Sequence, residues 1–216
     1  MEILNNLITD KKLLIFDLDG TIADTEPLHW AAYNLLLARQ GIVLDDAHIG
    51  TYIGNPETEI YKKIKVDFPA AMIEPEQFLK ERIGVYLSLA RETCLKPFPY
   101  FSRILEEYAD IPKALLTAQE SSVVETLIAY WGLENVFPKN RRLTAHDGKL
   151  TKKDVLSDIN KYIDVGARIQ NDGILLFEDS AHVLKIAHEC GVLSVGIEHR
   201  YNKGTLREFA EVVIDT

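Results

Sequence analysis

Residues Leu13–Thr21 read LLIFDLDGT, so a run of four apolar residues ends abruptly in a segment with two aspartates and a glycine. A short, continuous apolar run is typical of a strand that is buried on both faces of a parallel sheet. The sudden change to acidic residues and glycine indicates that the strand ends at a polar loop. The stretch therefore predicts a parallel sheet whose functional groups follow its strands.

Similar apolar runs recur along the chain, and segments with helical periodicity separate them. Strands that alternate with helices predict a doubly wound, Rossmann-like α/β core with a parallel sheet. Further strands are expected at Ala114–Thr117, Ile174–Phe177, Val192–Ile197 and Val212–Ile214, and helices at Ser121–Trp131, Lys152–Tyr162 and Ala181–Cys190. Thr151 and Asp154 predict a capping box at the start of the middle helix.

One segment, from Pro27 to about Arg91, departs from this alternation because it has helical periodicity and no convincing strand. Prolines punctuate it into several helices, at Pro56, Pro69 and Pro75. Lys96–Pro99, which reads KPFP, then indicates a stiff return linker. We therefore expect an α/β catalytic core at residues 1–24 and 93–216, with a helical cap inserted at residues 25–92.

The bulk composition is that of a globular protein, with 216 residues, a hydrophobic fraction of 47% and a charged fraction of 26%. The formal net charge of -9 argues against a broad nucleic-acid-binding surface, because phosphate backbones require basic patches. The charge does not exclude a small anionic substrate, since a bound metal and a few lysines reverse the local field.

The sequence also bears on location. Cys94 and Cys190 lie far apart and match no metal-ligand spacing, so we expect two reduced thiols. The segment Met1–Lys12 lacks the apolar core of a signal peptide, and no apolar run approaches the length that crosses a bilayer. These features predict a soluble, cytoplasmic protein with no nucleic-acid or membrane partner, present as a monomer or weak homodimer.

Paired carboxylates follow two of the expected strands. Asp17 and Asp19 come after the first strand, and Glu178 and Asp179 come after the strand at Ile174–Phe177. Because ligands bind beyond the carboxyl ends of parallel strands, we expect these side chains at one edge of the sheet. An oxygen-rich site suits Mg²⁺, and a carboxylate attacks phosphorus once a cation offsets its repulsion from phosphate. The pattern therefore indicates phosphoryl transfer.

Two orientations remain open for Asp19. If the strand continues, Asp17 and Asp19 share a face. If the chain turns at Gly20, the Asp19 carboxylate points towards a substrate while its backbone carbonyl faces a metal, because glycine permits such a turn.

Two further groups suit a phosphoryl group. Thr117 and Ala118 end a strand just before a helix, where a hydroxyl and a backbone N–H form an anion site. A lysine near residue 152 would neutralise the charge of the transferring group. Lys152 fits best because it stands at the expected helix start, and Lys149 is the rival.

The motifs resemble those of the haloacid dehalogenase superfamily. Asp17–Thr21 (DLDGT) is similar to the signature of that family, and Phe177–Ser180 (FEDS) is similar to its acidic motif. Asp24–His29 (DTEPLH) resembles the subgroup with a helical cap, which includes β-phosphoglucomutase and many sugar-phosphate phosphatases. Lys96–Pro99 resembles the return from cap to core.

The resemblance implies a role for each matching residue. Asp17 would be the nucleophile that forms an aspartyl-phosphate, and Asp19 would be the general acid and then the general base. Thr117, with the backbone of Ala118, would hold the phosphoryl oxygens, and Lys152 would pair with them. The implied Mg²⁺ ligands are Asp17, the Asp19 carbonyl and Asp179, with Glu178 near the metal or bridged to it by water.

The sequence departs from the family pattern at two places. The lysine of the family often lies in a Lys-Pro-x-Pro-Asp run, whereas Gly148–Asp154 reads GKLTKKD here. The polar pair that commonly follows the motif threonine is replaced by Ala118-Gln119, which leaves the phosphate contact intact but alters the lining of the pocket.

Three residues of the expected cap are candidates for substrate binding. Gly54 and Asn55 lie in a break between expected helices, which suits a loop that reaches the substrate. His29 lies in the first turn of a cap helix, where a packing or hinge role competes with a substrate role.

Asp19 narrows the choice among the activities of the resembling family. Haloacid dehalogenases carry an aromatic residue there and phosphonoacetaldehyde hydrolases an alanine, whereas an aspartate supplies the proton shuttle of phosphate-ester chemistry. We expect a Mg²⁺-dependent phosphatase that acts on a small phosphorylated metabolite. A phosphomutase similar to β-phosphoglucomutase is the alternative, although Gly54–Pro56 (GNP) lacks the arginine associated with the mutase cap loop. A catalytically silent binding protein is a third hypothesis, against which the intact acidic motifs count.

Overall fold

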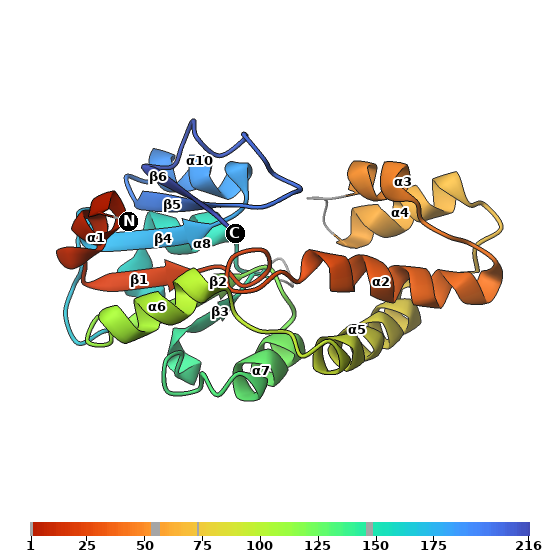
Figure 1. The fold of residues 1–216 in the computed structure, drawn as a ribbon, viewed down its shortest axis with the longest axis horizontal. Coiled ribbons are helices and arrows are strands. Elements are labelled where there is room, and N and C mark those ends of the chain that lie inside the picture. The colour runs from red at the N-terminus through yellow and green to blue at the C-terminus, as the bar shows by residue number, and fades with distance from the viewer. Residues whose placement is uncertain (1, 53–56, 73, 146–148) are drawn as a thin grey trace. The chain divides into compact units, whose positions relative to one another are not determined.

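The computed structural model describes residues 2–52, 57–72, 74–145 and 149–216. These residues form two compact units, one made of Met1–Asp24 with Lys96–Thr216 and the other of Thr25–Leu95. The first unit is an α/β fold and the second is helical (Figure 1). Within the described ranges, no helix is both long and apolar enough to span a membrane.

Six parallel strands form a single sheet among the described residues, in the order β3-β2-β1-β4-β5-β6. The strands are β1 (Leu13–Phe16), β2 (Lys113–Thr117), β3 (Arg142–Thr144), β4 (Ile174–Glu178), β5 (Leu193–Glu198) and β6 (Val212–Asp215). The strand order runs outward from β1 in one direction and from β4 in the other, so the centre of the sheet is a topological switch point. The expected doubly wound α/β core, with an inserted helical region, is confirmed.

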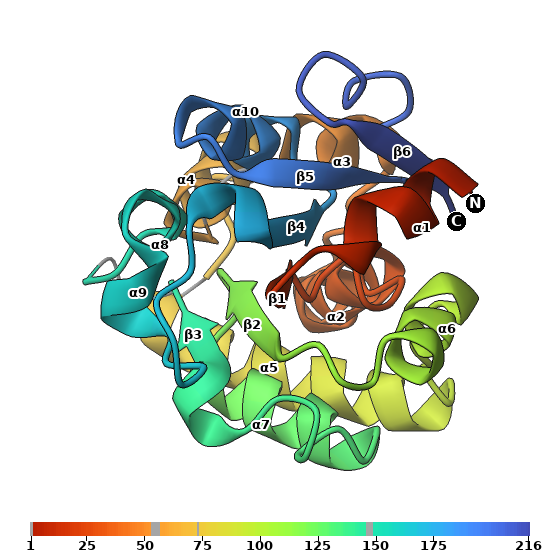
Figure 2. The ribbon, with the colours of Figure 1, turned by 90° about the vertical axis from the view of Figure 1, so that its left-hand side faces the viewer.

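Helices cover both faces of the sheet (Figure 2). Leu13 and Ile15 of β1 belong to a buried apolar cluster with residues of α8, α9 and α10. Phe16 faces the other way and meets Phe101 of α6 edge to face, with ring centroids 5.1 Å apart. The helices of this unit are α1 (Glu2–Thr9), α6 (Pro99–Glu107), α7 (Ser121–Tyr130), α8 (Lys152–Ser157), α9 (Ile159–Tyr162) and α10 (Ala181–Glu189).

The single helix expected over Lys152–Tyr162 is wrong, because two helices, α8 and α9, occupy this segment. Asp158 separates them, with φ of -149° and ψ of 78°, well outside the helical region. Just before it, the Ser157 hydroxyl donates to the Lys153 carbonyl at 2.7 Å. Serine and aspartate are poor helix formers because their side chains compete for backbone hydrogen bonds, which explains the break.

Three elements of this unit, α1, α6 and β3, have no counterpart among the expected ones. Strand β3 has three residues, too few for a periodic pattern to be visible. Helix α1 buries Leu4 and Ile8 one helical turn apart, but its eight residues are too few for a stable helix in isolation. Strand β3 depends on its pairing with β2, which a local pattern does not report.

The second unit consists of α2 (Glu26–Leu37), α3 (Asp46–Tyr52), α4 (Glu57–Asp67) and α5 (Pro75–Glu92). Its described residues contain no strand, as the sequence indicated. Pro75 opens α5, a position that suits proline because the first helical N–H has no partner in the helix. Trp30 is 5% exposed within an aromatic cluster, and its indole N–H donates to Glu26 at 2.9 Å.

Candidate active site

The site lies at the switch point, where β1 and β4 end side by side. Asp17 directly follows β1 and is only 5% exposed, and its backbone N–H donates to the Phe177 carbonyl at 3.0 Å. Glu178 is the last residue of β4 and is 1% exposed. The pairing of two adjacent parallel strands therefore brings together carboxylates that are far apart in the chain.

Lys152 lies between these two carboxylates. Its ammonium group is 2.8 Å from Asp17 Oδ1 and 2.7 Å from Glu178 Oε2. The capping box predicted from the sequence is confirmed: the Thr151 hydroxyl accepts from the Asp154 N–H, and the Asp154 carboxylate accepts from the Thr151 N–H. This cap fixes the start of α8 and hence the position from which Lys152 reaches the site. The rival, Lys149, is exposed.

Asp17, Glu178 and Asp179 form an acidic cluster. Each offers a carboxylate oxygen, and these oxygens lie within 4.8 Å of one another. An all-oxygen ligand set at this spacing suits a hard divalent cation rather than a soft one. The residues present therefore fit the divalent metal that the sequence implied.

The electrostatics of the cluster support the same conclusion. Burial raises the pKa of Asp17 to about 7, although the charge of Lys152 opposes the shift. Burial likewise raises the pKa of Glu178 to about 7 and raises the pKa of Asp179. Burial would lower the pKa of Lys152, but Asp17 and Glu178 outweigh it and raise the pKa above its ordinary value. Lys152 pairs with two of the three acids, Asp17 and Glu178, and a bound cation would relieve the repulsion that remains within the cluster.

The loop after Asp17 turns sharply at Gly20. Gly20 has φ of +67°, and its N–H donates to the Ala23 carbonyl at 3.0 Å. Of the two orientations considered for Asp19, the chain therefore adopts the turn. The Asp19 carboxylate lies near Gln119, whose side-chain N–H donates to Asp19 Oδ2 at 3.1 Å.

Thr117 ends β2, as the sequence indicated, and its side chain is buried. Its hydroxyl accepts from the Gln119 N–H at 3.1 Å, and α7 begins four residues later at Ser121. Ala118 lies between them, exposed at the same edge of the sheet. A hydroxyl, backbone N–H groups and a helix start thus gather beside the carboxyl end of β1.

Some contacts of the site were not expected from the sequence. His199 Nε2 lies 2.9 Å from Asp179 Oδ2, and the Tyr100 hydroxyl donates to the Thr21 carbonyl within the loop after β1. His199 comes one residue after β5, so the rule that strand ends carry functional groups could have singled it out. Tyr100 has no comparable signal, because it lies in the first turn of α6.

The cap candidates fare differently. His29 stacks on Tyr86 with ring centroids 4.5 Å apart, and its Nδ1 lies 3.0 Å from Arg82 Nη1. These contacts agree with a packing role, and a substrate role stays a prediction. Gly54 and Asn55 lie outside the described residues.

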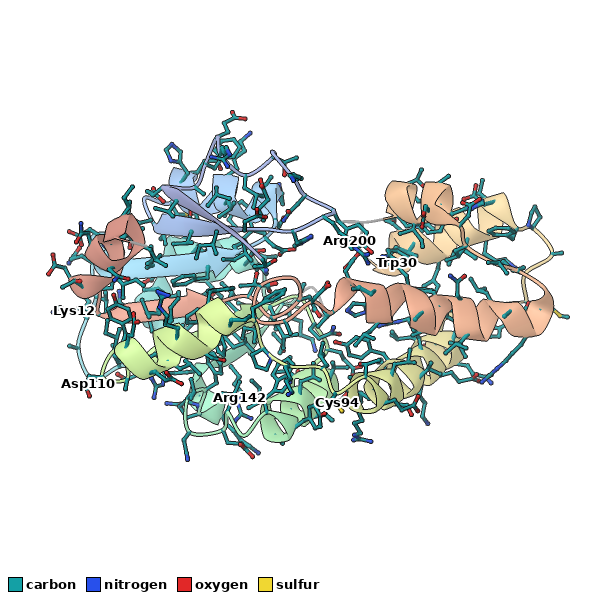
Figure 3. All side chains as sticks on the ribbon, in the orientation of Figure 1. Lys12, Trp30, Cys94, Asp110, Arg142 and Arg200 are labelled. Atoms are coloured by element: carbon teal, nitrogen blue, oxygen red, sulfur yellow. The ribbon has the colours of Figure 1, made fainter. Side chains whose placement is uncertain are left out.

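Figure 3 gives the orientation of the core. Lys12 and Asp110 mark the end of the sheet where the strands begin, whereas Arg200 belongs to the loop after β5, where they end. The acidic cluster lies at the second of these two ends. Asp17 and Asp179 directly follow β1 and β4, and Glu178 is the last residue of β4, as the geometry of parallel strands requires.

Comparison with known proteins agrees with this geometry. A family described as haloacid dehalogenase-like hydrolase matches residues 14–197, most of the 216-residue chain. The chain belongs to this family. Fructose-1-phosphate phosphatase YqaB of Escherichia coli (strain K12) is 31% identical to this hydrolase over 124 residues, which are 57% of the chain and 65% of YqaB. The match spans slightly less than two thirds of that relative.

Solved structures share the fold of this haloacid dehalogenase-like hydrolase. CbbY from Rhodobacter sphaeroides, in complex with phosphate, superposes with a TM-score of 0.76 at 18% identity, over 94% of this chain and 93% of CbbY. β-Phosphoglucomutase from Clostridium difficile gives a TM-score of 0.68 at 19% identity, over 95% and 91% of the two chains. At these identities the likeness shows the fold alone.

Proposed function

We propose that this hydrolase is a Mg²⁺-dependent phosphatase that cleaves a small phosphorylated metabolite through an aspartyl-phosphate on Asp17. The observation that carries the proposal is the buried carboxylate of Asp17, 2.8 Å from Lys152 and within the acidic cluster that includes Asp179. A carboxylate held beside a lysine and a cation site is equipped to attack a phosphate ester.

In the proposed first step, Asp17 attacks phosphorus and the bond from phosphorus to the ester oxygen breaks. Asp19 gives its proton to the departing oxygen, so an alcohol leaves and an aspartyl-phosphate remains. Lys152 balances the negative charge of the phosphoryl oxygens, and Thr117 with the Ala118 N–H hydrogen-bonds to them.

In the second step, Asp19 takes a proton from water, and the oxygen of that water attacks phosphorus. The bond between Asp17 and phosphorus breaks, which restores the carboxylate and releases inorganic phosphate. Gln119 holds the Asp19 carboxylate in both steps through its side-chain N–H. Asp17, Glu178, Asp179 and the Asp19 carbonyl would hold Mg²⁺, which offsets the repulsion between carboxylate and phosphate.

We further propose that the substrate is a phosphorylated sugar and that the helical unit, as a cap bounded near residues 25 and 92, sets specificity. The relative that matches this chain over 124 residues is named a fructose-1-phosphate phosphatase, and CbbY has been solved with xylulose-(1,5)-bisphosphate. The core groups all engage one phosphoryl group, so the leaving group must be recognised elsewhere. We therefore assign recognition of the leaving group to residues outside the core.

The first test is hydrolysis of an aryl phosphate and of a panel that includes fructose 1-phosphate. We expect inorganic phosphate to be released with Mg²⁺, to cease after EDTA treatment and to return when Mg²⁺ is restored. Activity that survives exhaustive chelation would remove the metal from the mechanism, and no hydrolysis of any ester would favour a silent binding protein.

The second test follows the phosphoryl group. A single turnover in H₂¹⁸O should place no label in Asp17, because water attacks phosphorus and the label leaves in phosphate. Label found in Asp17 would mean attack at the carbonyl carbon and would contradict the second step. A phosphomutase would instead convert β-glucose 1-phosphate to glucose 6-phosphate with little phosphate release.

A further inference from the structure

The loop after β5 contacts both the carboxylate and the backbone carbonyl of Asp179. The His199 ring lies 2.9 Å from Asp179 Oδ2. From the same loop, the Asn202 side-chain N–H donates to the Asp179 carbonyl at 2.7 Å and to the Ile197 carbonyl at 3.0 Å. The carboxylate and the backbone of this one aspartate are therefore both held by the loop.

The hydrogen bonds of the His199 ring define its tautomer. The Tyr201 backbone N–H donates to His199 Nδ1 at 3.2 Å, so Nδ1 carries a lone pair. The ring proton is then on Nε2, and it is this N–H that donates to Asp179 Oδ2. The imidazole is thus an oriented donor to the carboxylate, held from its far side by the backbone.

Gly20 leaves room for this pair. A Cβ atom at Gly20 would lie 2.4 Å from Asp179 Oδ2 and 3.0 Å from His199 Nε2, which is too close for any side chain. The turn that shapes the loop after β1 therefore packs directly against the hydrogen bond. With glycine on one side and the imidazole on the other, the Asp179 carboxylate has little freedom to rotate.

The loop after β5 is also held by hydrogen bonds that do not involve the imidazole. The His199 backbone N–H donates to Asn202 Oδ1 at 2.8 Å, and the Gly204 N–H donates to Glu198 Oε1 at 2.7 Å. Together with the contacts of Asn202, these bonds secure the loop after β5. The donation from His199 Nε2 is the imidazole contact that reaches Asp179.

We propose that His199 is a positioning residue that orients Asp179 for binding of the catalytic divalent cation. The proposal rests on the proposed function, because it takes Asp179 as a metal ligand. A donor that engages one carboxylate oxygen fixes the plane of the group and directs the other oxygen to the metal. Hydrogen bonds of this kind to metal ligands change metal affinity or activity by roughly 10–100-fold when removed.

Direct titration of the EDTA-treated protein with Mg²⁺ by calorimetry tests the proposal. We expect His199→Leu to weaken Mg²⁺ binding by roughly 10–100-fold. His199→Gln should retain most of the affinity, because its amide N–H reaches nearly as far as Nε2–H. His188→Leu makes the same change at an exposed histidine of α10 and should bind Mg²⁺ like the wild type.

Two outcomes would overturn the proposal: wild-type affinity in His199→Leu, or equal losses in His199→Leu and His199→Gln. Melting temperatures without metal show whether each variant is folded. If the variants do not fold, NMR of ¹⁵N-histidine-labelled wild-type protein decides. The His199 ring must then show a proton on Nε2, and its signals must shift when Mg²⁺ is added; unshifted signals would contradict the proposal.

The Mg²⁺ titration uses no substrate, so it fails independently of the proposed function. Absence of phosphate release would reject the phosphatase and leave the affinity difference standing. Wild-type affinity in His199→Leu, with normal hydrolysis by the wild-type enzyme, would reject only the role of His199.

Discussion

The two units of the molecule bury different kinds of side chain. The core buries Asp17 and Glu178 at one edge of its sheet, beside the half-buried Lys152, and the desolvation of the two acids raises their pKa. The helical unit buries mostly aromatic and aliphatic side chains, with Arg82 near His29 among them.

This difference shows why the two units differ in how much their sequences reveal. Phosphoryl transfer requires carboxylates, a cation and donors at fixed places, so few residue types satisfy it. A helical cap requires only apolar faces that pack together, which many sequences provide. The motifs of the core therefore indicate its proposed chemistry, whereas no motif of the helical unit indicates the specificity that we propose for it.

Removal of the nucleophile is expected to have the largest effect on the core. Asp17→Asn should lower kcat by about 10⁴-fold or more, because an amide neither attacks phosphorus nor offsets the charge of a metal. Steady-state hydrolysis of an aryl phosphate measures the loss. Asp110→Asn, an exposed aspartate at the other end of the sheet, should leave kcat unchanged. Substantial turnover by purified Asp17→Asn would contradict the assignment of Asp17 as the nucleophile.

The second aspartate separates attack from proton transfer. Asp19→Ala keeps the nucleophile and should lower hydrolysis of a sugar phosphate by about 10²–10⁴-fold. The loss should be smaller for an aryl phosphate, whose leaving group needs little protonation. Comparing kcat for the two substrates in wild type and variant makes the measurement. Equal losses for both would speak against the proton role.

The role proposed for the helical unit is tested by measuring the substrate specificity of a variant in it. Asn55→Ala should change the ratio of kcat/KM between sugar phosphates by about 10-fold, the scale of one or two lost contacts. It should spare hydrolysis of a small aryl phosphate. Gln77→Ala, at an exposed position of α5, is the matched control and should leave the ratios unchanged. A uniform shift of all substrates would mean that the cap loop does not read the leaving group.

The smallest expected effect is on stability. Asp17 and Glu178 have native pKa values near 7, raised from 3.8 and 4.5, so between these limits the native state binds more protons than the unfolded state. The free energy of unfolding of the metal-free protein should therefore fall as pH rises from about 4 to about 7, and this contribution should level off above that.

Asp17→Asn should make that decline shallower, and its metal-free melting temperature at pH 8 should exceed that of the wild type by a few degrees. Calorimetric scans in EDTA from pH 5 to pH 8 measure the slopes. Asp110→Asn should follow the wild-type slope. Parallel curves for wild type and Asp17→Asn would show that burial of this carboxylate costs no stability.

Much of the fold and part of the site could be predicted because strand ends obey a simple geometric rule. Asp17 and Glu178 follow buried apolar runs, and the capping box of Thr151 placed Lys152 at a helix start. The contacts of His199 and Gln119 depend on how two loops fold back, which periodicity does not encode. Strand β3 was missed because its three residues are held by pairing with β2, and the break at Asp158 was missed because the apolar pattern of the segment was weighed above the poor helix propensity of Ser157 and Asp158.

The order of the strands also bears on how the molecule is made. Lys152 and Asp17 are joined across 135 positions of sequence, and β1 pairs with β4 at the centre of the sheet. During synthesis, the backbone edge of β1 that pairs with β4 therefore stays unpaired until the helical unit, β2, β3 and α8 have been made. Long-range pairing of this kind slows folding and exposes strand edges to other chains. A nascent chain that stalls before β4 therefore presents an unpaired edge of β1, with which strands of other chains can pair.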